Sequence, residues 1–241
     1  MIRGLYTAVS GMVTLEAKQA SITNNLANIN TTGYKAEELI LKSFDEVMLQ
    51  NKDNKQNQKR DIGGISLGVE IDGTYKRKDQ GIMSTTDNTT DFAIDGEGYF
   101  VFEGMNEYNY SRNGNFKVGT NGYMFNSNGQ RVMGENIRTG EFEPIFVGND
   151  DFRMNTNNEI SVNGKPAEYR ILTAKFDEDK QPNFDERVYI AQGNTEKSNV
   201  NLVDEMANMI GVMRAFETNQ KIVQTMDEVL GKAANEIGAV R

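Results

Sequence analysis

The stretch that decides the fold is residues 5–29, LYTAVSGMVTLEAKQASITNNLANI. Its apolar residues recur at alternating intervals of three and four positions, the spacing that gathers side chains on one face of a helix. The series runs through Leu5, Ala8, Met12, Leu15, Gln19, Ile22, Leu26 and Ile29, with Gln19 as its polar member. The pattern predicts an amphipathic helix, and Gly33 suits a left-handed position that closes it.

The C-terminal end of the chain has the same pattern. Intervals of four and three connect Leu202, Met206, Met209, Met213, Phe216, Gln220, Val223, Asp227, Leu230, Ala234 and Ile237. Asn201 can accept a hydrogen bond from the first turn, and Asp204 stabilises the positive end of the helix dipole. A second amphipathic helix is therefore expected from about residue 201 to about residue 237.

The middle of the chain is rich in turn signals. Asn-Gly and Asp-Gly pairs favour tight β-hairpin turns, because both residues of such turns need positive φ. These pairs are Asp72-Gly73, Asp95-Gly96, Asn113-Gly114, Asn121-Gly122, Asn128-Gly129 and Asn163-Gly164. Short apolar runs between them predict an antiparallel β domain. Residues 39–49 are interpreted as either helical or extended, and the polar residues 51–61 as an exposed or flexible stretch.

The apolar stripe on each terminal helix has to be covered by another element. The economical solution is that the two helices pack on each other and on further copies of the chain. The alternative is an ordinary α+β fold in which both helices cap the β domain. We predict an α+β protein with N- and C-terminal helices pairing as a coiled-coil-like inner domain and a central antiparallel β domain. Residues 1–48 and 197–241 would form the helical part, 49–75 an extended connector, and 76–196 the β domain.

The composition excludes several kinds of chemistry. The 241 residues include no cysteine, histidine or tryptophan, which excludes disulfides, thiol nucleophiles, imidazole ligands and a histidine base. The formal net charge of -9 argues against nucleic acid or an anionic membrane as the main partner. No apolar run approaches the ~18 residues of a transmembrane helix, and the N-terminus is unlike a cleaved signal peptide. On these grounds alone the protein would be interpreted as cytosolic.

Carboxylates are the remaining candidates for catalysis, since a paired-acid hydrolase needs two of them in one cleft. Asp91, Asp95 and Glu97 form a cluster, but it falls in a predicted turn, where such side chains are usually solvated. No glycine-rich segment completes a phosphate-binding motif, and no acidic segment has the spacing of a calcium loop. We therefore expect no catalytic, cofactor-binding or metal-ligating residue.

The end of the first predicted helix has an unusual composition. Residues 24–35 read NNLANINTTGYK, and the asparagines at 24, 25, 28 and 30 are poor helix formers. So many side-chain amides near a helix end indicate hydrogen bonds to groups outside the helix, although local capping by asparagine is an alternative. This run closely resembles the N-terminal signature of the flagellar rod and hook protein family.

Further segments resemble the same family in the same order. Residues 91–100, DFAIDGEGYF, and 110–116, YSRNGNF, are similar to motifs of its central domain. Residues 198–206, SNVNLVDEM, resemble its C-terminal signature, which continues through Met209-Ile210 and 214–217, RAFE. The matches span nearly the whole chain, so together they are highly specific.

The resemblance implies a structural subunit, not an enzyme, that is exported unfolded and uncleaved by the flagellar type III apparatus. Its terminal helices would form the inner layer of a tubular polymer in the basal body, with the β domain outside. Implied partners are further copies, other rod proteins, the hook protein, the export apparatus and the surrounding ring or bushing, with no nucleic acid and no membrane insertion. The distal rod branch is favoured over a proximal rod or hook-type subunit. A monomeric binding module or adhesin is the alternative of another class, and an acid-pair glycosidase ranks third.

The apolar stripes and the signature together predict the residues of the assembly interface. They are Leu5, Met12, Leu15, Ile22, Asn25, Leu26, Asn28, Ile29, Leu202, Met206, Met209, Met213, Phe216, Val223 and Leu230. Residues 51–61 are a further candidate contact between subunits.

Overall fold

The computed structural model describes residues 2–52, 59–105, 107–148, 151–176, 181–184 and 188–237. It contains two compact units, each made of segments distant in the sequence. The helical unit comprises Met1–Ala27, Glu37–Arg77 and Asn201–Arg241, and the β unit comprises Asn28–Ala36 and Lys78–Val200. Terminal helices and a central antiparallel strand region confirm the predicted α+β class.

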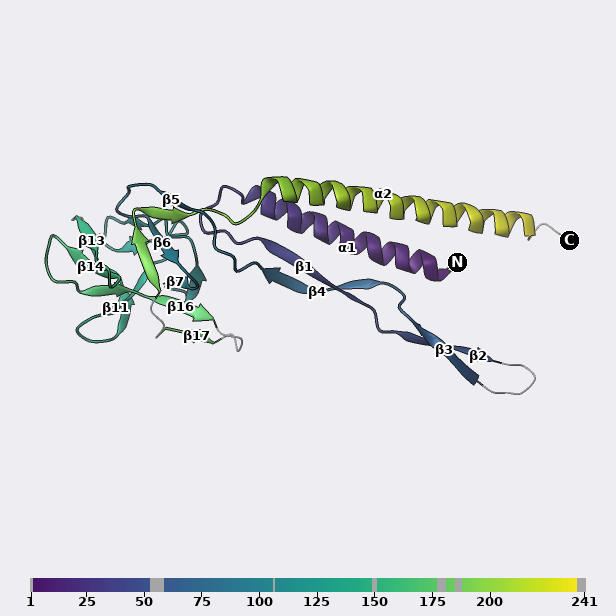
Figure 1. Ribbon diagram of the computed structural model, residues 1–241, viewed down its shortest axis with the longest axis horizontal. Helices are drawn as coiled ribbons and strands as arrows, with labels where there is room; N and C mark the ends of the chain where they lie inside the picture. The colour runs from purple at the N-terminus through teal and green to yellow at the C-terminus, as the bar shows by residue number, and fades with distance from the viewer. Residues whose placement is uncertain are drawn as a thin grey trace. The chain divides into compact units, whose positions relative to one another are not determined.

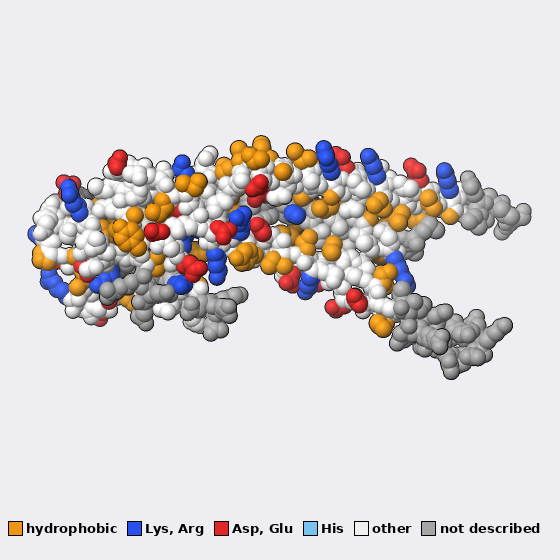
Figure 2. Space-filling view, viewed as in Figure 1, with side chains coloured by type: hydrophobic (Ala, Val, Ile, Leu, Met, Phe, Trp, Pro, Cys, Tyr) orange, Lys and Arg blue, Asp and Glu red, His pale blue; other side chains and the backbone are white. Residues whose placement is uncertain are grey.

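Two long helices run side by side in the helical unit, α1 (Ile2–Ala27) and α2 (Leu202–Lys232) (Figure 1). Three contacts define their antiparallel register: Gly4 lies against Met226, Gly11 lies against Asn219, and Asn25 bonds to Glu205. A Cβ atom on Gly11 would lie 3.1 Å from the Nδ2 atom of Asn219, so this glycine lets the helices approach closely. Both helices also expose hydrophobic side chains (Figure 2).

The predicted start of α2 is confirmed, whereas the predicted end of α1 is not. Asn201 caps α2 as predicted, since its Oδ1 atom accepts a hydrogen bond of 3.0 Å from the amide of Val203. The helix continues into one π-helical turn, Ala233–Ile237. The first helix instead ends at Ala27, so the prediction that it reaches Ile29 is wrong. Gly33 has the expected positive φ of 69°, but it lies beyond this end and closes no helix.

A long antiparallel hairpin completes the helical unit. Strand β1 (Glu37–Ser43) pairs with β4 (Val69–Lys76), and β2 (Val47–Lys52) pairs with β3 (Lys59–Ile65). Residues 39–49 are therefore extended wherever they form a regular element, and residues 53–58 of the predicted exposed stretch lie outside the described residues. The turn predicted at Asp72-Gly73 is wrong, because that pair lies within β4 at a register shift.

The β unit consists of short antiparallel strands. The main sheets have the orders β12-β11-β15-β14-β13 and β17-β16-β7-β8, and three further pairs are β6 with β18, β5 with β19 and β9 with β10. The strand bounds are β5 (Met83–Thr85), β6 (Phe92–Asp95), β7 (Tyr99–Phe102), β8 (Asn109–Ser111), β9 (Lys117–Val118), β10 (Met124–Phe125), β11 (Met133–Asn136), β12 (Phe142–Pro144), β13 (Phe152–Met154), β14 (Glu159–Val162), β15 (Tyr169–Ile171), β16 (Thr173–Phe176), β17 (Pro182–Asn183), β18 (Tyr189–Gln192) and β19 (Asn194–Glu196).

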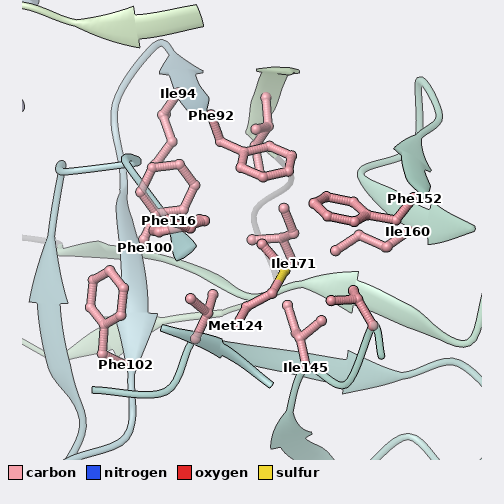
Figure 3. Close-up of a cluster of buried hydrophobic side chains, with 13 residues drawn as sticks. Phe92, Ile94, Phe100, Phe102, Phe116, Met124, Ile145, Phe152, Ile160 and Ile171 are labelled. Carbon is pink, nitrogen blue, oxygen red and sulfur yellow. The ribbon is translucent and has the colours of Figure 1, made fainter. Parts of the chain in front are cut away.

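The core of the β unit combines phenylalanine rings with aliphatic side chains (Figure 3). The ring of Phe116 lies 5.1 Å from that of Phe100, 5.5 Å from that of Phe92 and 5.9 Å from that of Phe102, measured between centroids. All four side chains are fully buried or nearly so. The central motifs noted in the sequence thus supply part of this core, through Phe92, Phe100 and Phe116.

Some of the Asn-Gly turns predicted from the sequence form in the β unit, and others do not. Asn121-Gly122, Asn128-Gly129 and Asn163-Gly164 lie in turns with positive φ at the glycine, but of the three asparagines only Asn163 has the positive φ that was also predicted. The prediction fails at Asn113-Gly114, where the glycine carbonyl instead accepts a hydrogen bond of 2.9 Å from the amide of Phe92. The acidic cluster begins directly before Phe92, at a position that is buried and not solvated.

That position is Asp91, which orders the loop around it. Its carboxylate accepts hydrogen bonds from Thr86 Oγ1 at 2.7 Å, Asn115 Nδ2 at 2.8 Å and Asn88 Nδ2 at 3.2 Å. The interpretation of Asp91 as a solvated turn residue is therefore wrong, and its role in the fold is structural.

Candidate assembly interface

The predicted interface residues of α1 lie mainly on one side of that helix. Ile22 is buried, and the others on the helix stripe, Leu5, Met12, Leu15 and Leu26, are half-buried. Asn28 and Ile29 belong to the β unit, beyond the end of α1. The face of α1 that the sequence did not single out exposes Tyr6, Val9 and Val13.

The predicted stripe of α2 divides into two faces. Met209, Phe216, Val223 and Leu230 are half-buried and share a helical face with Asn219 and Met226, which contact α1. Leu202, Met206 and Met213 lie further around the helix and are exposed. The face that packs on α1 also includes Val212 and Glu205, which the apolar series had missed.

The exposed face at the start of α2 is a continuous apolar surface, which we call the α2 ridge. Its side chains are between 44% and 71% exposed, and they are Leu202, Val203, Met206, Ile210 and Met213. Figure 2 shows hydrophobic side chains gathered over this beginning of the helix. An apolar patch of this kind is typical of an interaction surface.

A second apolar surface lies between α1 and the hairpin, and we call it the α1–hairpin groove. It encloses about 630 Å³ and is lined by Arg3, Tyr6, Val9, Ser10, Phe44, Asp45, Val47 and Leu67. The hydroxyl of Thr7 donates a hydrogen bond of 2.9 Å to the carbonyl of Leu67, which ties α1 to the hairpin beside the groove. The groove is therefore built from segments fixed to each other within the helical unit.

The signature asparagine Asn25 is buried inside the helical unit. Its amide nitrogen donates hydrogen bonds to the carbonyl of Glu37 at 3.0 Å and to the carboxylate of Glu205 at 3.1 Å. Its amide oxygen accepts a hydrogen bond of 2.9 Å from the backbone of Glu37. These bonds lie outside α1, as the composition predicted, and they join α1, β1 and α2 of the same chain.

The last residue of the signature, Lys35, belongs to a buried cluster of charged side chains in the β unit. The carboxylate of Glu196 lies 2.6 Å from the ammonium of Lys35 and 3.0 Å from the guanidinium of Arg112. All three side chains are at most 5% exposed. Glu196 also accepts a hydrogen bond of 2.8 Å from the amide of Gly81, and Lys35 donates one of 2.7 Å to the carbonyl of Asp79. We call Lys35, Arg112 and Glu196 the buried triad.

The triad connects segments that are far apart in the sequence. Lys35 lies in the N-terminal signature, Arg112 in the 110–116 motif, and Glu196 in β19, just before the C-terminal signature. Gly33 brings the first of these segments close, because its amide donates a hydrogen bond of 2.8 Å to the carbonyl of Glu196. No pattern in the sequence marks this cluster, since each member is a common charged residue.

Three family models match the chain in order. The flagella basal body rod protein model matches residues 5–35, the flagellar hook protein FlgE/F/G D1 domain model matches residues 93–165, and the flagellar basal body rod FlgEFG protein C-terminal model matches residues 191–236. The flagellar basal-body rod protein FlgG of Borreliella burgdorferi is 30% identical over 264 residues, which cover 98% of each chain. The chain belongs to the flagellar basal-body rod protein family.

Other relatives also match over the whole length. The flagellar hook-basal body complex protein FlhO of Bacillus subtilis is 28% identical over 276 residues, covering 100% of both chains. The flagellar basal-body rod protein FlgF of Rhizobium meliloti is 28% identical over 256 residues, also covering 100% of both. The chain is thus a structural subunit of the rod, located in the flagellar basal body.

The matched segments coincide with the structural features described above. The first runs through α1 and ends at Lys35, and the last begins in β18 and runs through α2. Both terminal matches therefore contribute a member of the buried triad as well as a long helix. No helix in the described part of the chain is long and apolar enough to cross a membrane.

Proposed function

We propose that this rod subunit polymerises through α1 and α2 to form the inner layer of a drive shaft that transmits torque to the hook. The observation that carries the proposal is the pairing of the two helices, which still leaves large apolar surfaces exposed. A free monomer would have to keep these surfaces in water, whereas neighbouring copies would bury them. The β unit, with its own hydrophobic core, would form the outer layer.

The predicted interface residues take two roles in this proposal. Those facing the partner helix would hold α1 and α2 together as a coiled-coil-like pair within each subunit. The exposed ones, Leu202, Met206 and Met213, would contact neighbouring copies. This division supports assembly from pre-paired helices, in which each copy presents a formed surface to the next.

The proposed partners are further copies, other rod proteins, the hook protein, the flagellar export apparatus and the surrounding bushing. The relatives' names support the first part of this set, because they are rod and hook-basal body proteins. We propose no enzymatic activity, no cofactor and no metal. A monomeric adhesin receives no support from the relatives.

The distal rod is the position that we propose within the axle. Relatives named FlgG from Borreliella burgdorferi and Bacillus subtilis, each covering 98% of this chain, support it. A proximal rod position is the second candidate, because the FlgF of Rhizobium meliloti matches the chain from end to end.

Electron microscopy of basal bodies from a strain that lacks this gene tests both candidates. A distal rod subunit predicts a rod that stops short of its full length and carries no hook. A stub that ends closer to the cytoplasmic membrane would favour the proximal position. Complete rods with hooks and filaments would contradict a required role in the axle.

A further inference from the structure

We infer that the α2 ridge of one copy inserts into the α1–hairpin groove of a second copy, and that this contact makes the polymer open-ended. The inference rests on the proposed function, because it names the surfaces through which that assembly occurs. The ridge and the groove are both apolar, and neither is covered by the helical unit to which it belongs.

The register of the helices keeps a copy from covering its own groove. The groove lies beside the first turns of α1, which face the part of α2 near Asn219 and Met226. The ridge is centred near Met206 and Ile210, about 15 residues earlier in α2, or about 22 Å along the axis at 1.5 Å per residue. Ridge and groove are thus displaced along one axis and must meet between different copies.

A contact between two different surfaces has a consequence for symmetry. A two-fold dimer would require each copy to insert its ridge into the groove of the other at the same time, whereas a contact through one ridge and one groove is heterologous and leaves a free ridge and a free groove at the two ends. Such contacts close into rings or continue as open helical arrays. The displacement of about 22 Å along the helix axis favours an array that grows along the helices.

Charges at the rims of the two surfaces complement each other. Arg3 and Asp45 line the groove, and the end of the ridge is followed by Arg214 and Glu217, each four residues after a ridge side chain. None of the ion pairs found among the described residues involves these four groups. Pairing Arg3 with Glu217 and Asp45 with Arg214 would orient the ridge in the groove, and charged rims of this kind set register more than affinity.

The chain has no cysteine, so disulfide cross-linking can test the contact without background. One allele carries Met206→Cys in the ridge, and the other carries Val47→Cys in the groove. The alleles replace the native gene singly or together, and isolated basal bodies are oxidised and run on a non-reducing gel. The inference predicts a cross-linked dimer only when both alleles are present. A control pairs Val47→Cys with Gly231→Cys, an open position of α2 outside the ridge, and should give no dimer.

The outcomes separate the contact from the proposed function. Motile cells whose rods give no mixed dimer, or give dimers with either allele alone, would overturn the ridge-in-groove contact and leave the rod role intact. Complete rods in cells without any copy of the gene would overturn the rod role itself.

A charge exchange tests the contact independently of the cysteine alleles. Arg3→Glu and Glu217→Arg should each reduce swimming, and the double variant should restore it. Normal swimming of both single variants, or a double variant as impaired as the worse single one, would overturn the proposed orientation.

Discussion

The carboxylate of Glu196 forms ion pairs with Lys35 and Arg112 in the interior of the β unit, where all three side chains are buried. Glu196→Ala would leave Lys35 and Arg112 without their anion, and losing one partner of a buried ion pair typically costs about 3–5 kcal/mol. We expect a loss of that size in the free energy of unfolding of the β unit, measured by urea denaturation with tyrosine fluorescence. Glu168→Ala is the control, because its pair with Arg138 is exposed and should contribute at most about 1 kcal/mol. Equal losses for the two variants would refute the role of the triad.

Position 33 requires glycine for two reasons, the positive φ of its backbone and the lack of room for a Cβ atom. Its φ is 69°, and a Cβ atom there would collide with the backbone of Arg112 and Asn113. Gly129 has a similar φ of 78° but open space around it, so Gly129→Ala isolates the conformational cost, about 1–2 kcal/mol. Gly33→Ala should lower the urea midpoint of the β unit clearly further than Gly129→Ala. Matching midpoints would mean that the signature segment is not packed tightly against residues 112–113.

Apart from Asn25, whose hydrogen bonds outside α1 were predicted, the sequence predicted residues whose partners are local and missed those whose partners are distant. Asn201 was recognised because an N-cap bonds to an amide two residues away. The ion pair between Lys35 and Glu196 joins residues 161 positions apart, and nothing in the pattern around either one marks it. Asp91 was misread for the same reason, since its burial depends on how the loop closes around it.

At the scale of elements, the periodicity predicted that α2 exists but not which face packs on α1. An alternating series beginning at Leu202 and another beginning at Glu205 both fit the helix, and the packed one includes the polar residues Glu205 and Asn219. The predicted series therefore combines residues of the packed face, such as Met209 and Phe216, with exposed residues such as Met206. The sequence also did not predict the hairpin, because its Asp72-Gly73 pair lies at a register shift within β4 instead of in a turn.

Gly11 in α1 and Gly211 in α2 distinguish the packed face from the open one. Gly211→Ala adds a methyl group in open space, so it should stabilise the helical unit by up to about 1 kcal/mol through helix propensity. Gly11→Ala has the same propensity gain but places its methyl group 3.1 Å from the amide nitrogen of Asn219. We expect it to gain less or to be destabilising, as measured by the helical signal in circular dichroism during thermal unfolding. A larger gain for Gly11→Ala would contradict the antiparallel register.

At the scale of the whole molecule, the chain leaves the helical unit after Ala27 and returns at Glu37, so a short segment of the N-terminal signature belongs to the β unit. We therefore expect a fragment of residues 28–200 to be more stable than one of residues 37–200, which lacks Lys35 and Gly33. The measurement is the urea midpoint of each fragment, followed by tyrosine fluorescence.

The matched control removes the hairpin instead of the signature. In the fragment 28–200, residues 37–77 are replaced by a short glycine-serine linker, which is long enough because Glu37 pairs with Lys76. This variant should keep the midpoint of the parent fragment, since the hairpin belongs to the helical unit. A loss as large as that of the 37–200 fragment would contradict the assignment of segments to units.

In the proposed rod, α1 and α2 form the inner layer, and a cryo-electron microscopy map of isolated basal bodies would locate both helices. We expect paired antiparallel helices at the smallest radius, with the β unit outside and the α2 ridge of each copy against the groove of another. A map in which the β unit lines the centre, or in which the two helices of a subunit are separated, would contradict this arrangement.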